Sequence, residues 1–289
     1  MNIYRLESKL DARRMVANVV VLGRFPLSFV VAVVSMLGYF LHTPEVTCTA
    51  FAAGLGSFFL CAGCSALNQV QEKRTDGYFS RTVLRPLPQG YLSARMAAMM
   101  GGVWIGLAAS LYAMTGSVQT LVLGAGVVGV YNGMYTALKR RSSIALLVGC
   151  VAGALPPLMG WVAAGGSVTD PLILTNCAIW YFAQIAHGWV QIYTHKEEYL
   201  SRFSPLVVSY FVLMHHKVLM RVWYFAYICS IMSFALVCTW TLGVPSLVGA
   251  FLGGILLLGS VLPLTRLTSL RLFDIASMCI LLGAVLVQL

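Results

Sequence analysis

The chain has 289 residues, of which 59% are hydrophobic and 10% are charged. Soluble domains are roughly 45–50% apolar and about 25% charged, so this composition excludes a soluble globular protein. Disorder is excluded as well, because disordered segments are poor in apolar residues. The formal net charge of +10 belongs to no soluble basic domain, and we expect no nucleic-acid partner. The sequence predicts an integral membrane protein surrounded by a lipid bilayer.

Nine apolar runs are each long enough to cross the bilayer as a helix, which takes about 20 residues. We therefore expect an all-α integral membrane protein with nine transmembrane helices, forming a single domain over residues 1–289. The predicted spans are 16–41, 46–67, 96–114, 118–138, 144–164, 171–193, 222–241, 246–265 and 272–289. The apolar segment 203–214 is too short to span, and we place it at the interface or in a lid. The charged first fifteen residues lack the apolar core of a signal peptide, so we expect the N-terminus to be retained.

Lysine and arginine concentrate on the cytoplasmic side of membrane proteins, which tests this topology. With nine spans, all 19 basic residues fall on one side of the membrane, and the linkers near 42–45, 115–117, 165–170 and 242–245 hold none. This pattern predicts a cytoplasmic N-terminus and an outer C-terminus.

A first acidic cluster follows the second predicted span, where Asn68, Glu72 and Asp76 recur every four residues. On a helix this spacing places the three side chains on one face, about 6 Å apart along the axis. Ionisable groups beside a membrane bundle are costly and usually functional. Such a series of oxygen atoms can bind one cation, although a solvated amphipathic turn would show the same spacing.

A second acidic pair, Glu197 and Glu198, follows the sixth predicted span on the same side of the membrane. Both clusters can therefore converge on one cavity. Oxygen ligands favour Mg²⁺, which proteins hold with one or two carboxylates together with substrate phosphates. Basic residues on the same side can hold phosphate oxygens, namely Arg81, Arg85, Lys139, Arg140 and Arg141. Basic residues at a membrane surface can also simply contact anionic lipid heads, which is our interpretation of Arg13, Arg14, Arg266 and Arg271.

The eight cysteines all lie in apolar runs, and we interpret them as reduced packing residues. Cys61 and Cys64 form a CxxC motif, but Ser65 follows them where haem attachment needs histidine.

The segment from Asn68 to Gly90 resembles the NxxxDxxxD…RTxxRPLxxG signature of the UbiA-type intramembrane prenyltransferases. Within that superfamily, Tyr135 to Trp161 is similar to the YTxxLKR…GxxxGAxPPxxGW region of the protoheme IX farnesyltransferase family. Gln184 to Tyr199 looks like its PHF…DY region, with His187 at the histidine position. Glu72 and Glu198 stand where the family has aspartate, and Ala186 and Gly188 replace the proline and phenylalanine.

This resemblance implies a UbiA-like bundle with a cytoplasmic-side cap from the inter-helix loops. It implies Mg²⁺-dependent transfer of a farnesyl group from farnesyl diphosphate to protohaem, with haem as substrate rather than cofactor. It places the protein in the inner (plasma) membrane with the active site towards the cytoplasm, and suggests a haem A synthase or an oxidase-assembly factor as partner.

The expected roles follow the proposed chemistry. The basic residues and the metal would stabilise the departing diphosphate. Aromatic faces would stabilise the allylic cation, and His187 would contact the haem. The expected catalytic residues are Asn68, Glu72, Asp76, Arg81, Lys139 and Tyr135. The expected substrate-binding residues are Arg85, Arg140, Tyr131, His187, Trp161, Glu197, Glu198 and Tyr199, and the metal ligands are Asn68, Glu72, Asp76 and Glu198.

The amino-acid sequence leaves two other functions open. A prenyltransferase of the same architecture could alkylate a quinone precursor or another flat aromatic acceptor. A transporter of an anionic or isoprenoid lipid would carry broken helices near the bilayer midplane, and Pro156 and Pro157 could mark such a break.

Overall fold

The computed structural model describes residues 3–201, 204, 206, 214–242, 277, 279, 280 and 282–286, and these contain helices but no strand. The helices are α1 (Ile3–Leu22), α2 (Phe25–Phe40), α3 (Cys48–Asp76), α4 (Ala94–Met114), α5 (Val118–Val128), the π-helix η1 (Gly129–Tyr135), α6 (Thr136–Leu138), α7 (Ala145–Ala154), α8 (Pro156–Ala163), α9 (Pro171–Thr194), α10 (Lys196–Leu200) and α12 (His216–Leu242). The all-α prediction is confirmed for this part of the chain.

Local sequence signals set where several helices begin. Thr47, Ser93 and Ser117 precede α3, α4 and α5, and each side-chain hydroxyl accepts a hydrogen bond from a backbone amide of the first turn. Asp170 does the same for α9, which has proline at its first position. These side chains satisfy amides that would otherwise lack a partner.

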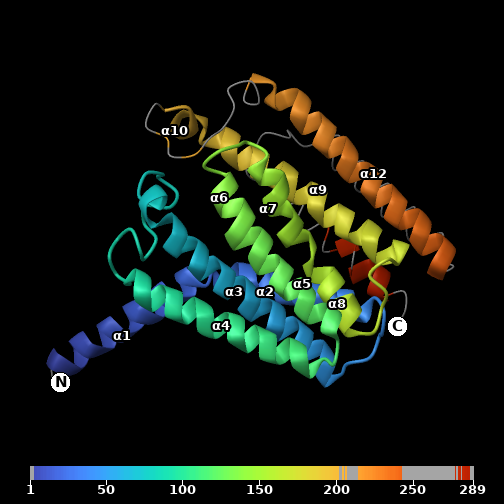
Figure 1. Ribbon diagram of the computed structural model, residues 1–289, viewed down its shortest axis with the longest axis horizontal. Helices are drawn as coiled ribbons and strands as arrows, with labels where there is room; N and C mark the ends of the chain where they lie inside the picture. The colour runs from blue at the N-terminus through green and yellow to red at the C-terminus, as the bar shows by residue number, and fades with distance from the viewer. Residues whose placement is uncertain are drawn as a thin grey trace.

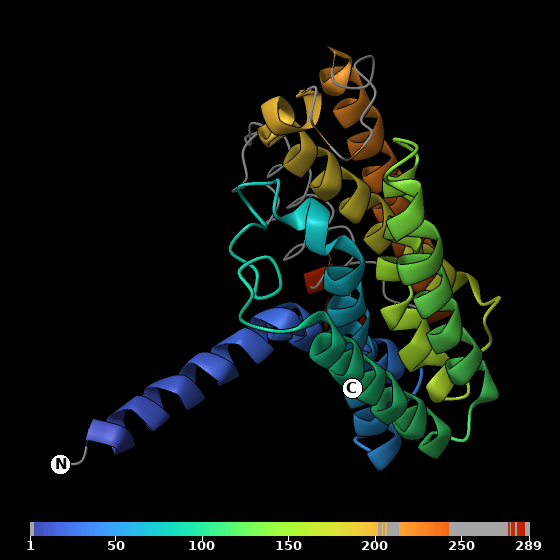
Figure 2. The same ribbon diagram turned by 60° about the vertical axis from the view of Figure 1, so that its left-hand side comes forward.

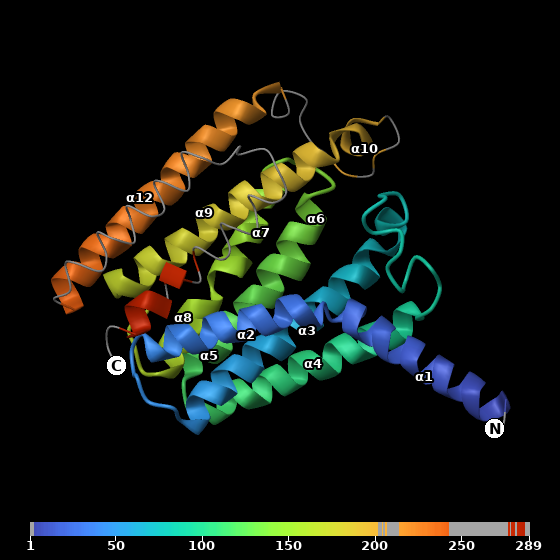
Figure 3. The ribbon, with the colours of Figure 1, turned by 180° about the vertical axis from the view of Figure 1, so that it is seen from behind.

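The helices lie side by side in one bundle. α3 lies between α2 and α4, and α9 packs along α12 (Figures 1 and 3). α8 packs against α2, and α7 against α9 and η1. α1 extends away from the bundle at the N-terminal end (Figure 2).

Five helices in the described residues are long and apolar enough to cross a membrane, or six if a bent pair counts as one span. This agrees with a membrane protein but does not reach the nine spans that we expected. The predicted spans 246–265 and 272–289 lie wholly or largely outside the described residues, as does most of the segment 203–214. The sixth predicted span, 171–193, is helical as α9 but is not among those five helices.

One predicted span bends sharply, and another has a local interruption at the two prolines that we had noted as a possible break. The first, 16–41, bends by 49° between α1 and α2, where Arg24 has a left-handed backbone with φ of 48°. The fifth, 144–164, is interrupted at Leu155, because Pro156 and Pro157 lack the amide hydrogens that continue a helix.

α2 and α8 approach each other closely through glycine. A Cβ on Gly160 would lie 1.8 Å from the carbonyl oxygen of Ser35, and one on Gly38 would lie 2.1 Å from that of Pro157. Small residues at such a crossing allow helix backbones to pack in membranes.

We expect Gly160→Ala to lower the free energy of unfolding by about 1–3 kcal/mol, because its methyl group overpacks this crossing. The measurement is thermal or denaturant unfolding of the detergent-solubilised protein. Gly106→Ala is the matched control, since a Cβ at Gly106 has no neighbour within 4 Å. Equal stability of the two variants would contradict this account of the crossing.

Candidate functional site

A cavity of about 530 Å³ runs into the bundle between α2, α3, η1, α7, α8 and α9. One end holds charged side chains from α3, the linker 77–93 and Lys139, and we call it the charged end. The walls further in are mostly apolar, with Leu60, Val127 and Met159 among their residues. The cavity therefore combines a polar mouth with an apolar interior.

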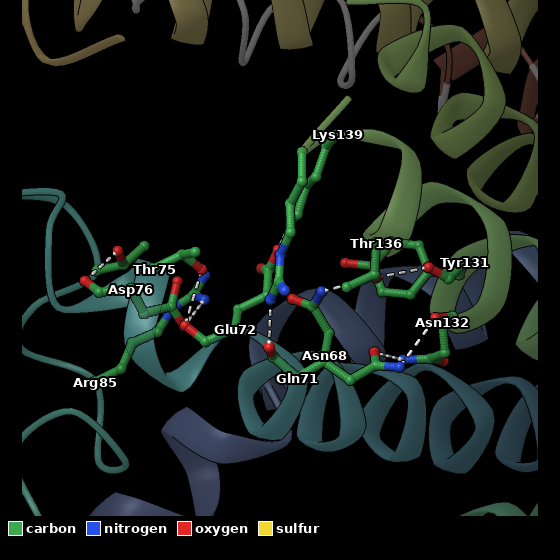
Figure 4. A network of polar contacts seen from close by, with 12 residues as sticks. Asn68, Gln71, Glu72, Thr75, Asp76, Arg85, Tyr131, Asn132, Thr136 and Lys139 are labelled. Carbon is green, nitrogen blue, oxygen red and sulfur yellow. Dashed lines mark hydrogen bonds and ion pairs between the residues drawn. The ribbon is translucent and has the colours of Figure 1, made fainter. Parts of the chain in front are cut away.

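α3 continues past the predicted end of its span to Asp76, so Asn68, Glu72 and Asp76 lie on one helix. Glu72 forms an ion pair with Lys139, which follows α6. The side chains of Glu72 and Lys139 are only 6% and 16% exposed. Because a buried charge without a partner is very costly, this pair ties α3 to the end of α6 (Figure 4).

Asp76 forms the second ion pair of this end. Arg85 Nη1 lies 2.7 Å from Asp76 Oδ2, and Thr82 Oγ1 donates to the Asp76 carbonyl oxygen at 2.7 Å. Both partners come from the linker 77–93, so the two contacts fold that linker back onto the end of α3.

Further polar contacts hold η1, α6 and the residues after α6 against α3. Asn68 Nδ2 donates to Thr136 Oγ1 at 3.2 Å, and Asn132 Nδ2 donates to the Cys64 carbonyl oxygen at 3.0 Å. Arg140 Nη2 donates to the Gln71 carbonyl oxygen at 2.7 Å (Figure 4). These bonds fix the position of η1 and α6, which lead directly to Lys139, relative to α3, which carries Glu72.

Two tyrosines of η1 form an aromatic wall beside the charged end. The rings of Tyr131 and Tyr135 lie 5.4 Å apart at 34°, and both residues line the cavity. Lys139 Nζ lies 4.9 Å from the centre of the Tyr135 ring. His187 of α9 also lines the cavity. Its Nε2 lies 3.0 Å from the side-chain nitrogen Nε2 of Gln191.

The linker 77–93 and α10 meet at the mouth of the cavity. Glu198 accepts hydrogen bonds from Ser80, at 3.1 Å from its backbone nitrogen and 2.5 Å from its hydroxyl. The rings of Phe79 and Tyr199 lie 4.9 Å apart, and both residues line the cavity. The hydroxyl of Ser80 lowers the pKa of the Glu198 carboxyl below its ordinary value, because it stabilises the carboxylate.

The structure gathers some of the expected site residues and separates others. Those that line the cavity are Glu72, Asp76, Arg81, Tyr131, Tyr135, Lys139, His187 and Tyr199. Asn68, Arg85, Arg140 and Glu198 contact neighbouring parts of the charged end without lining the cavity. Glu197 is exposed and is not part of the lining.

Trp161 does not lie where we expected it. It is buried in a core cluster that includes side chains of α2, α9 and α12, and its Nε1 donates to the Ser167 carbonyl oxygen at 3.0 Å. It is a packing residue at the end of α8, outside the cavity lining, and we do not include it in the site.

The expected metal ligands Asn68, Glu72, Asp76 and Glu198 do not form one cluster, and nowhere in the described residues do three His, Cys, Asp or Glu side chains gather. Glu72 and Asp76 instead lie one turn apart on α3, each beside a cation. Two carboxylates at a cavity wall still match the oxygen chemistry of Mg²⁺, which takes one or two carboxylates plus phosphate oxygens.

Arg24 and Gln184 line the cavity, although neither belongs to the motifs that predicted the site. Arg24 lies at the break between α1 and α2, and Gln184 lies in the middle of α9. Each is a polar side chain within a predicted span. Because polar groups in spans tend to face a bundle interior, this signal could have identified both.

Comparisons with known proteins agree with this geometry. A model of the UbiA prenyltransferase family matches residues 27–282. A protoheme IX farnesyltransferase of Nitratidesulfovibrio vulgaris (strain DP4) is 37% identical over 220 residues, which cover 76% of this chain and 77% of that relative.

Solved structures share the fold. The apo structure of a UbiA homologue from Aeropyrum pernix K1 has a TM-score of 0.68 and 16% identity, covering 91% of this chain and 98% of that one. A UbiA homologue from Archaeoglobus fulgidus, bound to GPP and Mg²⁺, has a TM-score of 0.65 and 14% identity. The match covers 93% of this chain and 99% of that one.

We expect the contact between Ser80 and Glu198 to persist as the pH falls below the ordinary glutamate pKa of about 4.3, because the folded pKa is lowered. The contact contributes stability above that pH and is lost as the pH falls through the lowered pKa. In Ser80→Ala we expect the loss to begin at higher pH. The measurement is amide hydrogen exchange of residues 77–93 against pH, corrected for the intrinsic rate. If the pH at which residues 77–93 lose half of their protection is the same in Ser80→Ala as in the unmodified protein, Ser80 does not hold this carboxylate.

Proposed function

Because the chain belongs to the UbiA prenyltransferase family, we propose that it transfers the farnesyl group of farnesyl diphosphate to a vinyl group of protohaem IX, giving haem O. The acceptor, protohaem IX, and the transferred farnesyl group are those in the name of its relative from Nitratidesulfovibrio vulgaris. The observation that carries the proposal is the cavity itself. Two buried carboxylate–cation pairs stand at the mouth of an apolar channel, which matches a substrate with a diphosphate head and an isoprenoid tail.

The diphosphate binds at the charged end. Lys139 and Arg85 leave their carboxylates and donate to phosphate oxygens, together with Arg81, which lines the same end. Glu72 and Asp76 would hold Mg²⁺, as their oxygen chemistry allows. The metal supplies Lewis-acid charge for the departing diphosphate, and a related fold was solved with GPP and Mg²⁺.

Bond cleavage produces separated charges at the charged end of the cavity. The bond between C1 of the farnesyl group and the diphosphate oxygen breaks, and its electron pair leaves with the diphosphate. Lys139, Arg85 and Arg81 stabilise that negative charge, which is the kind of electrostatic contribution that usually dominates such catalysis. The faces of Tyr131 and Tyr135 stabilise the allylic cation by about 0.5–2 kcal/mol each.

The acceptor approaches from the α9 side of the cavity. The π electrons of the vinyl group form the new bond to C1, water adds to the resulting cation, and the proton lost from that water goes to the departed diphosphate. His187 contacts the haem, either as an iron ligand or through a hydrogen bond, since neutral imidazole can serve both purposes. Gln191, at 3.0 Å, orients the ring, and Tyr199 covers the mouth.

The membrane placement belongs to the same proposal. The one-sided distribution of all 19 basic residues supports nine spans in the plasma membrane, with the charged end facing the cytoplasm. The whole chain then forms one transferase domain with a cytoplasmic N-terminus and an outer C-terminus. A haem A synthase or an oxidase-assembly factor would receive the product.

The direct test is mass spectrometry of the products after incubating the purified protein with Mg²⁺, farnesyl diphosphate and reduced protohaem. We expect a haem that is heavier by one farnesyl group plus water. Diphosphate release only in the presence of a quinone precursor would refute haem as acceptor and leave prenyl transfer intact. If no acceptor reacts and no diphosphate binds, the enzymatic proposal is wrong.

We expect Asp76→Asn to lower Mg²⁺-dependent turnover by about 100-fold or more, because several kcal/mol of charge stabilisation depend on the carboxylate. Glu45→Gln is the matched control, since Glu45 is exposed in the linker between α2 and α3. Its turnover should equal that of the unmodified protein. Normal activity of a folded Asp76→Asn protein would exclude Asp76 from the site.

A further inference from the structure

Polar side chains of α9 form a line along one side of the cavity. Gln184, His187 and Gln191 follow one another at spacings of three and four residues, and all three line the cavity. This spacing places them on one face of the helix. The face lies within the predicted span 171–193, where polar groups are costly and tend to face a bundle interior or a water-filled cavity. The cavity is therefore polar along α9 as well as at the charged end.

The wall that α2 contributes has the opposite character. Its lining residues are Leu27, Val30, Val31 and Val34, which are all apolar. A farnesyl tail carries no hydrogen-bonding atom, so it matches the α2 wall and cannot compensate an amide for lost hydration. The polar face of α9 therefore serves the acceptor, or a molecule that reacts with it.

Gly153 of α7 provides the space in which the Gln184 amide lies. A Cβ on Gly153 would overlap Oε1, Nε2 and Cδ of Gln184, so the whole amide lies against the backbone of α7. Both residues line the cavity. An amide offers an acceptor oxygen and two N–H donors. The bundle thus presents a neutral side chain in its interior that can bind a small polar molecule.

The proposed reaction consumes one water molecule inside this bundle. Once the vinyl group has bonded to C1 of the farnesyl group, its other carbon is a cation with two possible fates. In the first, a water oxygen forms a C–O bond to that carbon, and the proton lost from the water goes to the departed diphosphate. In the second, the neighbouring carbon loses a proton to the diphosphate, and a C=C bond forms without oxygen. The product depends on whether a water oxygen is already held beside the cation.

We propose that Gln184 binds this water and holds its oxygen beside the vinyl carbon, and that Gly153 positions the Gln184 amide. Gln184 lies about 4.5 Å along α9 from His187, which contacts the haem in the proposed function, so the bound water lies beside the acceptor. Oε1 of Gln184 accepts a hydrogen from the water and leaves an oxygen lone pair for the cation. A neutral amide suits this position, because a buried carboxylate would need a cationic partner.

This inference rests on the proposed function for the identity of the acceptor. It adds a water-binding residue, Gln184, and a positioning residue, Gly153, which together decide which of the two products forms.

The test measures the ratio of the two products. The purified protein is incubated with Mg²⁺, farnesyl diphosphate and reduced protohaem in heavy-oxygen water, and the haems are separated by chromatography before mass spectrometry. In the unmodified protein, we expect the hydrated product to predominate and to carry the heavy oxygen. Gln184→Met replaces the amide by a thioether on a side chain of similar length. We expect it to raise the ratio of dehydrated to hydrated product by about 10-fold, which is the effect of losing one hydrogen bond.

Gly153→Ala tests the same water with Gln184 present. The added methyl group displaces the amide, and we expect the product ratio to change in the same direction. This variant replaces Gln184→Met if that protein does not fold. The matched controls are Gln119→Met, since Gln119 is exposed on α5, and Gly126→Ala, since a Cβ at Gly126 has no neighbour within 4 Å. Both controls should give the product ratio of the unmodified protein.

The outcomes separate this inference from the proposed function. Farnesylated haem with the same product ratio in Gln184→Met, Gly153→Ala and the controls would refute Gln184 as the water-binding residue and leave the proposed function intact. A fall in total turnover at an unchanged ratio would refute it as well, because a merely structural role gives that result. If the unmodified protein forms no farnesylated haem, the proposed function is wrong and this inference fails with it.

Discussion

Carboxylates buried in a membrane bundle need a positive partner, and this requirement organises the charged end of the protein. Glu72 is paired with Lys139, and Asp76 with Arg85. The first pair joins α3 to the end of α6, and the second holds the linker 77–93 against α3. Because an uncompensated buried charge costs several kcal/mol, the two pairs fix these segments before any substrate arrives.

The same pairs explain how a structure held by charge can also bind a charged substrate. Buried ion pairs gain little net stability, since desolvation offsets most of their attraction. In the proposed function, the cations could therefore turn to a diphosphate at small cost, and the released carboxylates would hold Mg²⁺. The apolar interior behind them is where that proposal places the isoprenoid tail.

Much of this arrangement could be predicted from particular residues. The spacing of Asn68, Glu72 and Asp76 predicted one shared face if the segment were helical, and α3 does continue through it to Asp76. The break at Arg24 was missed because a left-handed backbone at a single residue leaves no trace in the hydrophobic periodicity. Trp161 was misplaced because a motif does not tell whether an aromatic ring faces the cavity or the core. The partner of Glu198, Ser80, is distant in sequence and becomes visible only in the fold.

The exchange of ion-pair partners at the charged end is the central event of the proposed binding. A structure of the protein with Mg²⁺ and an unreactive farnesyl thiolodiphosphate tests it. We expect Lys139 Nζ within hydrogen-bond distance of a phosphate oxygen and oxygens of Glu72 and Asp76 among the ligands of Mg²⁺. A structure in which Lys139 still pairs with Glu72, Arg85 still pairs with Asp76 and the diphosphate lies elsewhere would contradict it.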